Sequence, residues 1–440
     1  MLFYHYCQGE YLWGRGMFSS GNKGLRVLLA LGLVALGGCR ILVEVPAGGQ
    51  VVSDQGLTCS AGSTCIVDVE DTSYEETFEA VAAPGYTFTG WAHVGGQTVC
   101  GNTEAPCAFD LTIFSGNALI TALLVGDNDV VLAPVFEPVN DSSRYNVSEW
   151  QDFLDELGSF SYRSDSFLYA VQPDVGNCDP GVLNTAATSR FLYALNLVRK
   201  LHYLPPVEYD AFYNAEMQQA NLVQLANDYF THHPSPGDVC YTAAADTGAG
   251  TSNISWSSWQ GDPALYALGW INDNHNVSSL MAAGHRRWAL FPNLGYTAYG
   301  QVGGYSSMKV FGFNSPPGYD LPDDLEYVAF PYRNYPHVLV EKGSNPTPWS
   351  ISIVPSSGSG NYGYFDSASV SVRHAGTGAA LNVHSQYSDN FGYGLRNFYS
   401  WMVENWQYDT PYIVTISNVQ IPGAGSTTIE YPVEIDLAEF

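Results

Sequence analysis

The stretch Gly284-His285-Arg286-Arg287-Trp288-Ala289-Leu290-Phe291-Pro292 places a histidine beside two arginines in a chain that has only 16 basic residues. A glycine precedes the histidine and a proline ends the stretch, which is typical of a short helix with defined ends. We expect a helix over 277–290 that presents His285 at one edge of a binding site. Arg286 and Arg287 are expected to pair with carboxylates or to cap backbone carbonyls, rather than to bind phosphate.

The overall charge of the chain excludes some partners. Forty-three acidic residues against 16 basic ones give a formal net charge of -27, which repels nucleic acid and anionic membrane surfaces. An aromatic content of 14% and 44 glycines indicate a folded, β-rich protein rather than a disordered acidic chain. The length of 440 residues predicts about two to four domains.

The N-terminal segment has the features of an export signal. Lys23 and Arg26 precede the apolar run Val27–Gly38, which is shorter than the roughly 20 residues that span a bilayer as a helix. The following Leu36-Gly37-Gly38-Cys39 resembles the bacterial lipobox, whose cysteine is diacylated. This resemblance implies a lipid anchor on Cys39, at the outer membrane or cell surface, with full secretion as the alternative. Residues 1–39 are therefore set apart from the fold, with Met1 or Met17 as the start.

Six further cysteines predict three disulfides, because an exported protein folds in an oxidising compartment. The CxxC spacing that is typical of zinc sites does not occur in the sequence. Six cysteines allow many connectivities. The pairing of near neighbours is favoured because each of those pairs closes one turn. The expected pairs are Cys59 with Cys65, Cys100 with Cys107, and the distant Cys178 with Cys240.

Residues 40–137 predict a small all-β module, since apolar and polar residues alternate between glycine and aspartate turns. The expected strands are Ile41–Val45, Cys65–Val69, Thr77–Val81 and Val130–Phe136. The phrase Ala83–Trp91 and the later Ala133–Phe136 resemble the bacterial internalin B-type repeat. This resemblance implies a stalk or adhesive spacer, with Trp91 in its core.

Residues 138–175 read as a linker with one helix at Ser148–Leu157. Periodicity and breaker residues then predict alternating helices and strands. The predicted elements are helices at Ala186–Leu201, Val207–Phe230 and Pro263–Ile271, a loop at Gly248–Ile254, and strands at Leu294–Val302 and Ser307–Phe313.

Four motifs of this region occur together in a characteristic order. They are Leu195-Asn196-x-x-Arg199, Pro206-Val207-x-x-Asp210, His232-x-Pro234 and Gly284-His285-Arg286. In order and spacing they resemble the CAP superfamily of cysteine-rich secretory, antigen 5 and pathogenesis-related proteins. For residues 176–317 the resemblance implies a three-layer α-β-α sandwich with a central antiparallel sheet.

The CAP resemblance also implies a cleft with two histidines and two glutamates. His232 and His285 match the histidines, Ser252 replaces one glutamate before Asn253, and Asp273 stands for the other, three residues after Trp270. The implied ligand-binding residues are His232, Ser252, Asn253, Asp273 and His285. Two imidazoles and one carboxylate could hold one divalent ion, zinc or calcium, with water completing the shell. His233 and His275 are expected at the surface.

Three functions remain open from the sequence. The first is non-catalytic binding of a small apolar or peptide-like ligand, or of a surface protein. The second is hydrolysis, either by metal-activated water with Asp273 as ligand or base, or by a Ser252, His285 and Asp273 triad. The third is adhesion or a structural role with a degenerate CAP site.

Residues 318–440 predict a β-sandwich, because short strands and frequent turns recur at sandwich spacing. The phrase Asp409–Val419 resembles the late strands of an immunoglobulin-like module, which implies a packing or binding role. The expected strands are Val338–Val340, Trp349–Ile353, Ala368–Val372, Tyr412–Ile416 and Tyr431–Ile435.

Overall fold

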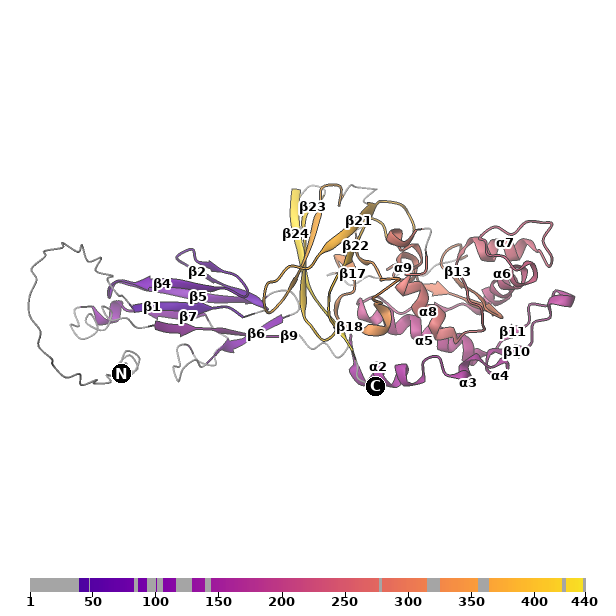
Figure 1. Cartoon of the computed structure of the whole chain (residues 1–440), viewed down its shortest axis with the longest axis horizontal. Helices are drawn as coiled ribbons and strands as arrows, with labels where there is room; N and C mark the ends of the chain where they lie inside the picture. The colour runs from indigo at the N-terminus through magenta and orange to yellow at the C-terminus, as the bar shows by residue number, and fades with distance from the viewer. Residues whose placement is uncertain are drawn as a thin grey trace, which may run out of the picture. The chain divides into compact units, whose positions relative to one another are not determined.

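A computed structural model describes residues 39–46, 48–82, 86–92, 100, 106–115, 129–138, 144–276, 279–314, 325–354, 364–421 and 425–437. The chain divides into two compact units, Met1–Val139 with Ala375–Gly378, and Asn140–His374 with Ala379–Phe440 (Figure 1). The predicted signal segment up to residue 38 and Ala83-Pro84-Gly85 of the repeat phrase lie outside the described residues. Within the ranges given, no helix is both long and apolar enough to cross a membrane.

The first unit is built from strands, as predicted. One sheet has the order β4-β1-β8 and another β3-β2-β5-β7, while β6 pairs with β9. Alternating side chains of these strands fill one core, and Trp91 is buried in it as expected. Disulfides join Cys59 to Cys65 and Cys100 to Cys107. The strands are β1 Cys39–Glu44, β2 Gly49–Ser53, β3 Thr58–Cys59, β4 Thr64–Val69, β5 Glu75–Ala82, β6 Tyr86–Trp91, β7 Cys107–Asp110, β8 Asp129–Leu132 and β9 Pro134–Pro138.

The second unit opens with helices that are packed into its core. Trp150 and Phe153 of α2 (Val147–Glu156) are buried, and so is Leu168 of α4 (Asp165–Leu168). Asn146 caps α2, since its side chain accepts from the backbone N–H groups of Ser148 and Glu149. The segment predicted as a linker therefore contributes apolar side chains to the folded unit. The other elements here are α3 Phe160–Arg163, β10 Tyr169–Val171 and β11 Val182–Leu183.

A central antiparallel sheet with the order β13-β16-β15 lies between helices. On one face, Gly300 of β15 approaches α6 so closely that a Cβ would lie 2.5 Å from the Met217 carbonyl. On the other face, the ring of Tyr299 stacks on that of Phe191 in α5, with ring centroids 4.4 Å apart. The indole N–H of Trp270 in α8 donates to the Ile254 carbonyl of β13. The elements are α5 Thr185–Leu201, α6 Asn214–Asn227, β13 Ser252–Trp256, α8 Pro263–Asn272, β15 Tyr299–Val302 and β16 Tyr305–Lys309.

The C-terminal part contains two further sheets, with the orders β17-β19-β22-β21 and β18-β24-β23-β20. Aromatic side chains pack between the two sheets. For example, the ring centroids of Tyr327 on β17 and Tyr431 on β24 are 5.9 Å apart. The strands are β17 Tyr327–Phe330, β18 Arg333–Pro336, β19 Trp349–Ile353, β20 Ser369–His374, β21 Val383–Asp389, β22 Phe398–Val403, β23 Tyr412–Ile421 and β24 Gly425–Asp436. These sheets share one continuous core with the α/β layer, so the core continues across the predicted boundary at residue 317.

Several local predictions were wrong. Residues 248–254 do not form a loop, because α7 (Ala243–Gly250) and β13 occupy them. Thr242 caps α7. The absence of a side chain at Gly248 allows α7 to lie against α6, since a Cβ on Gly248 would lie 2.6 Å from the Glu216 carbonyl oxygen. Figure 1 shows α6 and α7 side by side. Residues 338 and 339 belong to the 3-10 helix η6 (His337–Leu339), which follows Pro336 and ends before Val340, rather than to a strand.

Two predicted helices are shorter than expected. Residues 207–213 form β12 (Glu208–Tyr209), paired with β14 (Tyr296–Thr297), and the 3-10 turn η4 (Ala211–Tyr213), so α6 begins only at Asn214. The helix expected over 277–290 is limited to η5 (Leu280–Ala282) and α9 (Gly284–Ala289). Ala283 between them has a φ of 42°, in the left-handed region, and this interrupts the helix.

Candidate functional site

The candidate site begins where α8 ends. Asp273 terminates α8 in the left-handed conformation, with a φ of 54°, which aspartate tolerates better than most residues. Its side chain points at α9, whose own N-cap residue, Ala283, offers no side-chain acceptor. Oδ2 of Asp273 accepts from the backbone N–H groups of His285 at 3.0 Å and Arg286 at 3.4 Å. A carboxylate from another helix therefore caps α9.

The same carboxylate fixes the His285 ring. Oδ1 of Asp273 accepts from Nδ1 of His285 at 2.7 Å, and the Asp273 side chain is only 1% exposed while that of His285 is 24% exposed. Because an ionised carboxylate can only accept, Nδ1 carries the proton and Nε2 is left for other partners. Burial alone would lower the pKa of His285, but the charge of Asp273 and its hydrogen bond raise that pKa above the usual 6.5.

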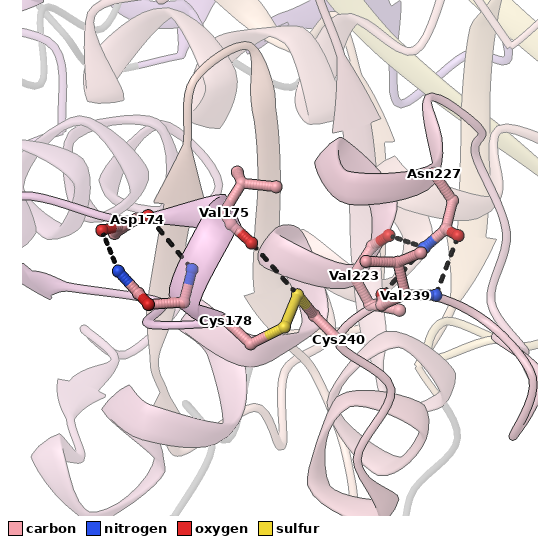
Figure 2. The surroundings of a disulfide bond; sticks show 8 residues. Asp174, Val175, Cys178, Val223, Asn227, Val239 and Cys240 are labelled. Carbon is pink, nitrogen blue, oxygen red and sulfur yellow. Dashed lines mark hydrogen bonds between the residues drawn. A yellow bond between two sulfur atoms is a disulfide. The ribbon is translucent and has the colours of Figure 1, made fainter.

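His232 lies in the segment between α6 and α7, which has no helix or strand in the described structure. A disulfide joins Cys240, near the end of this segment, to Cys178, and Figure 2 shows that the Cys240 sulfur also contacts the Val175 carbonyl. Asn227 closes the segment, since its amide donates to the Val239 carbonyl and its oxygen accepts from the Val239 N–H, each at 3.0 Å. These bonds restrict the loop that carries His232.

The imidazole of His232 is part-buried where it bonds the backbone, which orients the ring. Its Nδ1 donates to the carbonyl of Ala249, at the end of α7, at 2.9 Å. Burial lowers the pKa of His232, the Ala249 carbonyl opposes this, and positive charge on His285 and His233 lowers the pKa further. Ala249, which accepts from the His232 ring, lies just before β13, and Asn253 of β13 bonds the His285 carbonyl, so both histidines are attached near the start of this strand. The two pKa shifts are opposite in direction, so mild acid charges His285 before His232.

Ser252 and Asn253 are neighbours on β13, and consecutive strand side chains point to opposite faces. Asn253 faces α9, where its amide donates to the His285 carbonyl at 2.9 Å. The Ser252 hydroxyl instead donates to the Met217 sulfur on α6 at 3.3 Å, and Ser252 is buried there. The structure therefore brings Asn253, Asp273 and His285 together, but it does not bring Ser252 to His285 as a nucleophile would require.

The structure gives no direct support for a metal site. In the ranges described, no group of three or more His, Cys, Asp and Glu side chains is placed to hold a metal ion. Both oxygens of Asp273 are already bonded to α9, so this residue orients His285 in the way that a second carboxylate commonly orients a metal-bound histidine. The two Nε2 atoms of His232 and His285 remain the positions at which a divalent ion could bind.

The two arginines of the opening motif are internal. The Arg286 guanidinium donates to the carbonyls of Ile271 and Asn272, each at 2.6 Å, and to that of Pro348 at 2.7 Å, while Phe330 covers its face at 3.7 Å. Burial lowers the pKa of Arg286 to about 10, so it stays charged at neutral pH. Arg286 thus neutralises the negative C-terminal end of α8, and the prediction that it caps carbonyls is confirmed.

Arg287 connects α9 to the C-terminal sheets. It forms a bidentate ion pair with Asp389 of β21, at 2.8 and 2.9 Å, with side chains 0% and 6% exposed. It also donates to the carbonyls of Phe391 and Leu395, each at 2.8 Å. The predicted pairing with a carboxylate is confirmed. The C-terminal strands therefore hold the helix that bears His285.

Within the described structure, the other predicted residues do not contribute side-chain bonds to Asp273 or His285. His233 and His275 are exposed, as expected. Cys39, the expected lipidation site, is the first residue of β1, is buried, and pairs with Val69. A lipid on Cys39 would require this strand end to leave the core. The third predicted disulfide, between Cys178 and Cys240, is present, and disulfides are typical of exported proteins.

Sequence reasoning missed two features beside His285. Trp288 and Phe291 are partly buried and pack against the core, and Trp288 also stacks on Phe311 with ring centroids 5.1 Å apart. Asp389 was not considered because it lies about a hundred residues from Arg287 and no local pattern connects them. The spacing of His285 and Trp288, one helical turn, could have indicated a shared face.

Comparison of the chain with protein-family models, with curated proteins and with solved structures gives no match.

Proposed function

We propose that this is an exported protein that is anchored through Cys39. Its second unit binds a small apolar or peptide-like ligand between His232 and His285, and it does not convert this ligand chemically. The observation that carries this proposal is the hydrogen bond from His285 to the buried Asp273, which fixes Nδ1 of His285 and leaves its Nε2 for a ligand. Such a pre-oriented donor or acceptor lowers the entropic cost of binding.

The fold arrangement also supports a CAP-like interpretation of this region. Helices cover both faces of an antiparallel sheet, and both matched histidines come to the same end of it. Within this proposal the first unit serves as a stalk, and the C-terminal sheets form an immunoglobulin-like sandwich that supports the site. Binding is favoured over serine hydrolysis because Ser252 is hydrogen bonded to Met217 on the opposite face of β13.

Histidine-labelled protein tests the proposal by NMR. N-acetyl-phenylalanine amide, as an apolar amino acid probe, should shift the ring resonances of both His232 and His285, and N-acetyl-serine amide should shift them much less. His384, on the exposed part of β21, provides an internal control. Zinc and calcium chloride are titrated in separate samples, and a response to the metal alone would favour the metal-assisted form of the site. If neither histidine responds to the apolar probe, the ligand-binding proposal is wrong.

A further inference from the structure

The loop between β21 and β22 is folded around the buried guanidinium of Arg287. The carbonyls of Phe391 and Leu395 in this loop accept from that guanidinium, each at 2.8 Å. The Tyr393 ring centroid lies 5.5 Å from the guanidinium carbon, and the Leu395 N–H donates back to the Arg287 carbonyl at 3.1 Å. The side chains that the loop presents to solvent are therefore carried on a backbone that is organised before any ligand arrives.

Three large side chains of this loop are exposed. Phe391 is 61% exposed and Tyr393 is 51% exposed, and their ring centroids are 6.0 Å apart. Arg396 is exposed as well, and its guanidinium lies beside Gly392, where a Cβ would be 3.6 Å from Nη2 and 3.7 Å from Nε. The loop therefore places a cation next to the residue that separates two exposed aromatic rings.

The charge beside these rings is positive, although the chain as a whole is acidic. Within the part of the chain that the structure describes, Arg396 forms no ion pair and no side-chain hydrogen bond. The carboxylate nearest to it in the sequence, Asp389, is buried and holds Arg287 with both oxygens. Residues 390–403 contain no Asp or Glu, and neither does α9, against which the loop packs. The local charge therefore favours an anionic group on Arg396.

We propose that the surface formed by Phe391, Tyr393 and Arg396 binds the C-terminal residue of a peptide that ends in an aromatic or large aliphatic side chain. The terminal carboxylate pairs with the planar guanidinium of Arg396, and the terminal side chain packs on the two rings. In such a residue the carboxylate and the side chain are attached to the same carbon, which matches a cation placed directly beside the rings. A fatty acid fits less well, because its carboxylate and its apolar end are separated by a flexible chain that binding would have to order.

This loop belongs to the same part of the molecule as His285. A Cβ on Gly394 would lie 2.9 Å from the Cα of Trp288, and Trp288 follows His285 on α9 by three residues, which places the two on neighbouring positions of the helix. The inference therefore rests on the proposed function, and it names the end group of the peptide-like ligand.

Calorimetric titration of the full-length protein with three synthetic peptides separates the two contributions. At about 0.15 M salt the charges of distant carboxylates are largely screened. N-acetyl-Gly-Gly-Phe with a free carboxylate should bind, whereas its C-terminal amide and the Gly-Gly-Ser acid should bind at least about tenfold more weakly. Decanoate, as a fatty acid probe, should not displace the first peptide. Equal affinity of the acid and the amide, no saturable binding of the acid, or displacement by decanoate would overturn the inference. A response of His285 to N-acetyl-phenylalanine amide would still leave the proposed function standing.

Substitutions of exposed residues locate the binding surface. Arg396→Gln should abolish the preference for the acid over the amide, because it removes the charge that reads the carboxylate. Phe391→Ser should instead weaken both peptides by a similar factor, because it removes apolar contact. Lys200→Gln is the control for the loss of a cation, since this side chain on α5 is 39% exposed and pairs with Glu149, and it should keep the preference. Circular dichroism checks that each variant is folded.

Two results would contradict the assignment. One is a folded Arg396→Gln protein that still prefers the acid by about tenfold, and the other is an equal loss of this preference in Lys200→Gln. Unchanged affinity of Phe391→Ser for both peptides would show that the side chain does not pack on this loop, and would also overturn the inference.

Discussion

Replacement of Asp389 by Asn tests whether the C-terminal strands hold α9. The substitution removes the negative charge but keeps the size of the side chain, so Arg287 stays buried with only carbonyl and amide partners. Asp389 receives two Arg287 bonds at 2.8 and 2.9 Å, with side chains 0% and 6% exposed. Removing one partner of a buried ion pair costs about 3–5 kcal/mol, because the other charge is left without compensation.

The measurement is the free energy of unfolding from urea denaturation, followed by tryptophan fluorescence. Glu149→Gln is the matched control, because it breaks the pair with Lys200 at 2.8 Å in the same unit, where the side chains are 30% and 39% exposed. Such a surface pair contributes about 0–1 kcal/mol. Asp389→Asn should therefore lose at least about 3 kcal/mol, and Glu149→Gln at most about 1. Equal, small losses in the two variants would refute the role assigned to Arg287.

Three further predictions follow from the same geometry. Replacing Cys178 and Cys240 by Ser should lower the free energy of unfolding by about 4 kcal/mol, since the bridge closes a loop with a separation of 62 residues; a loss below about 1 kcal/mol would contradict this. Asp273→Asn should lower the pKa of His285, measured by NMR, because burial then acts without the opposing charge; an unchanged pKa would refute the pairing. Burial and neighbouring arginines lower the pKa of His202 to about 3, so native His202 stays neutral while the unfolded chain gains a proton below about 6.5. Stability should therefore fall as the pH drops from 6.5 towards 3, and less steeply in His202→Gln.

Elements with strong local signals could be predicted from the sequence. The helix at 186–201 has an apolar stripe and is stopped by two prolines, and it appears as α5. The alternating segments near residues 41, 65 and 77 appear as β1, β4 and β5. The prediction of a loop at 248–254 was wrong because it was based on the small residues of this segment. In the structure these small residues allow α7 to approach α6. Tertiary contact overrides a weak local preference there.

The site could be predicted only in part. The motifs named His285 and Asp273, which the structure joins, and Asn253, which bonds the backbone of the same helix. The side to which Ser252 points could not be read from its spacing, because a shift of one residue in strand register reverses the face. The role of the arginines became clear only with their partners. Arg144 and Arg199 also bond carbonyls at the ends of helices, at Leu201 and Ala289, and such long-range capping leaves no local pattern.

The central claim is that His232 and His285 share one site. It is tested most directly by the pKa of His232, measured by NMR in the wild type and in His285→Asn. The account predicts a pKa of His285 above 6.5 and of His232 below 6.5, and an increase in the latter when His285 is replaced, because a positive neighbour is removed. An unchanged pKa of His232 in a folded His285→Asn protein would show that the two side chains do not interact, and would contradict the account.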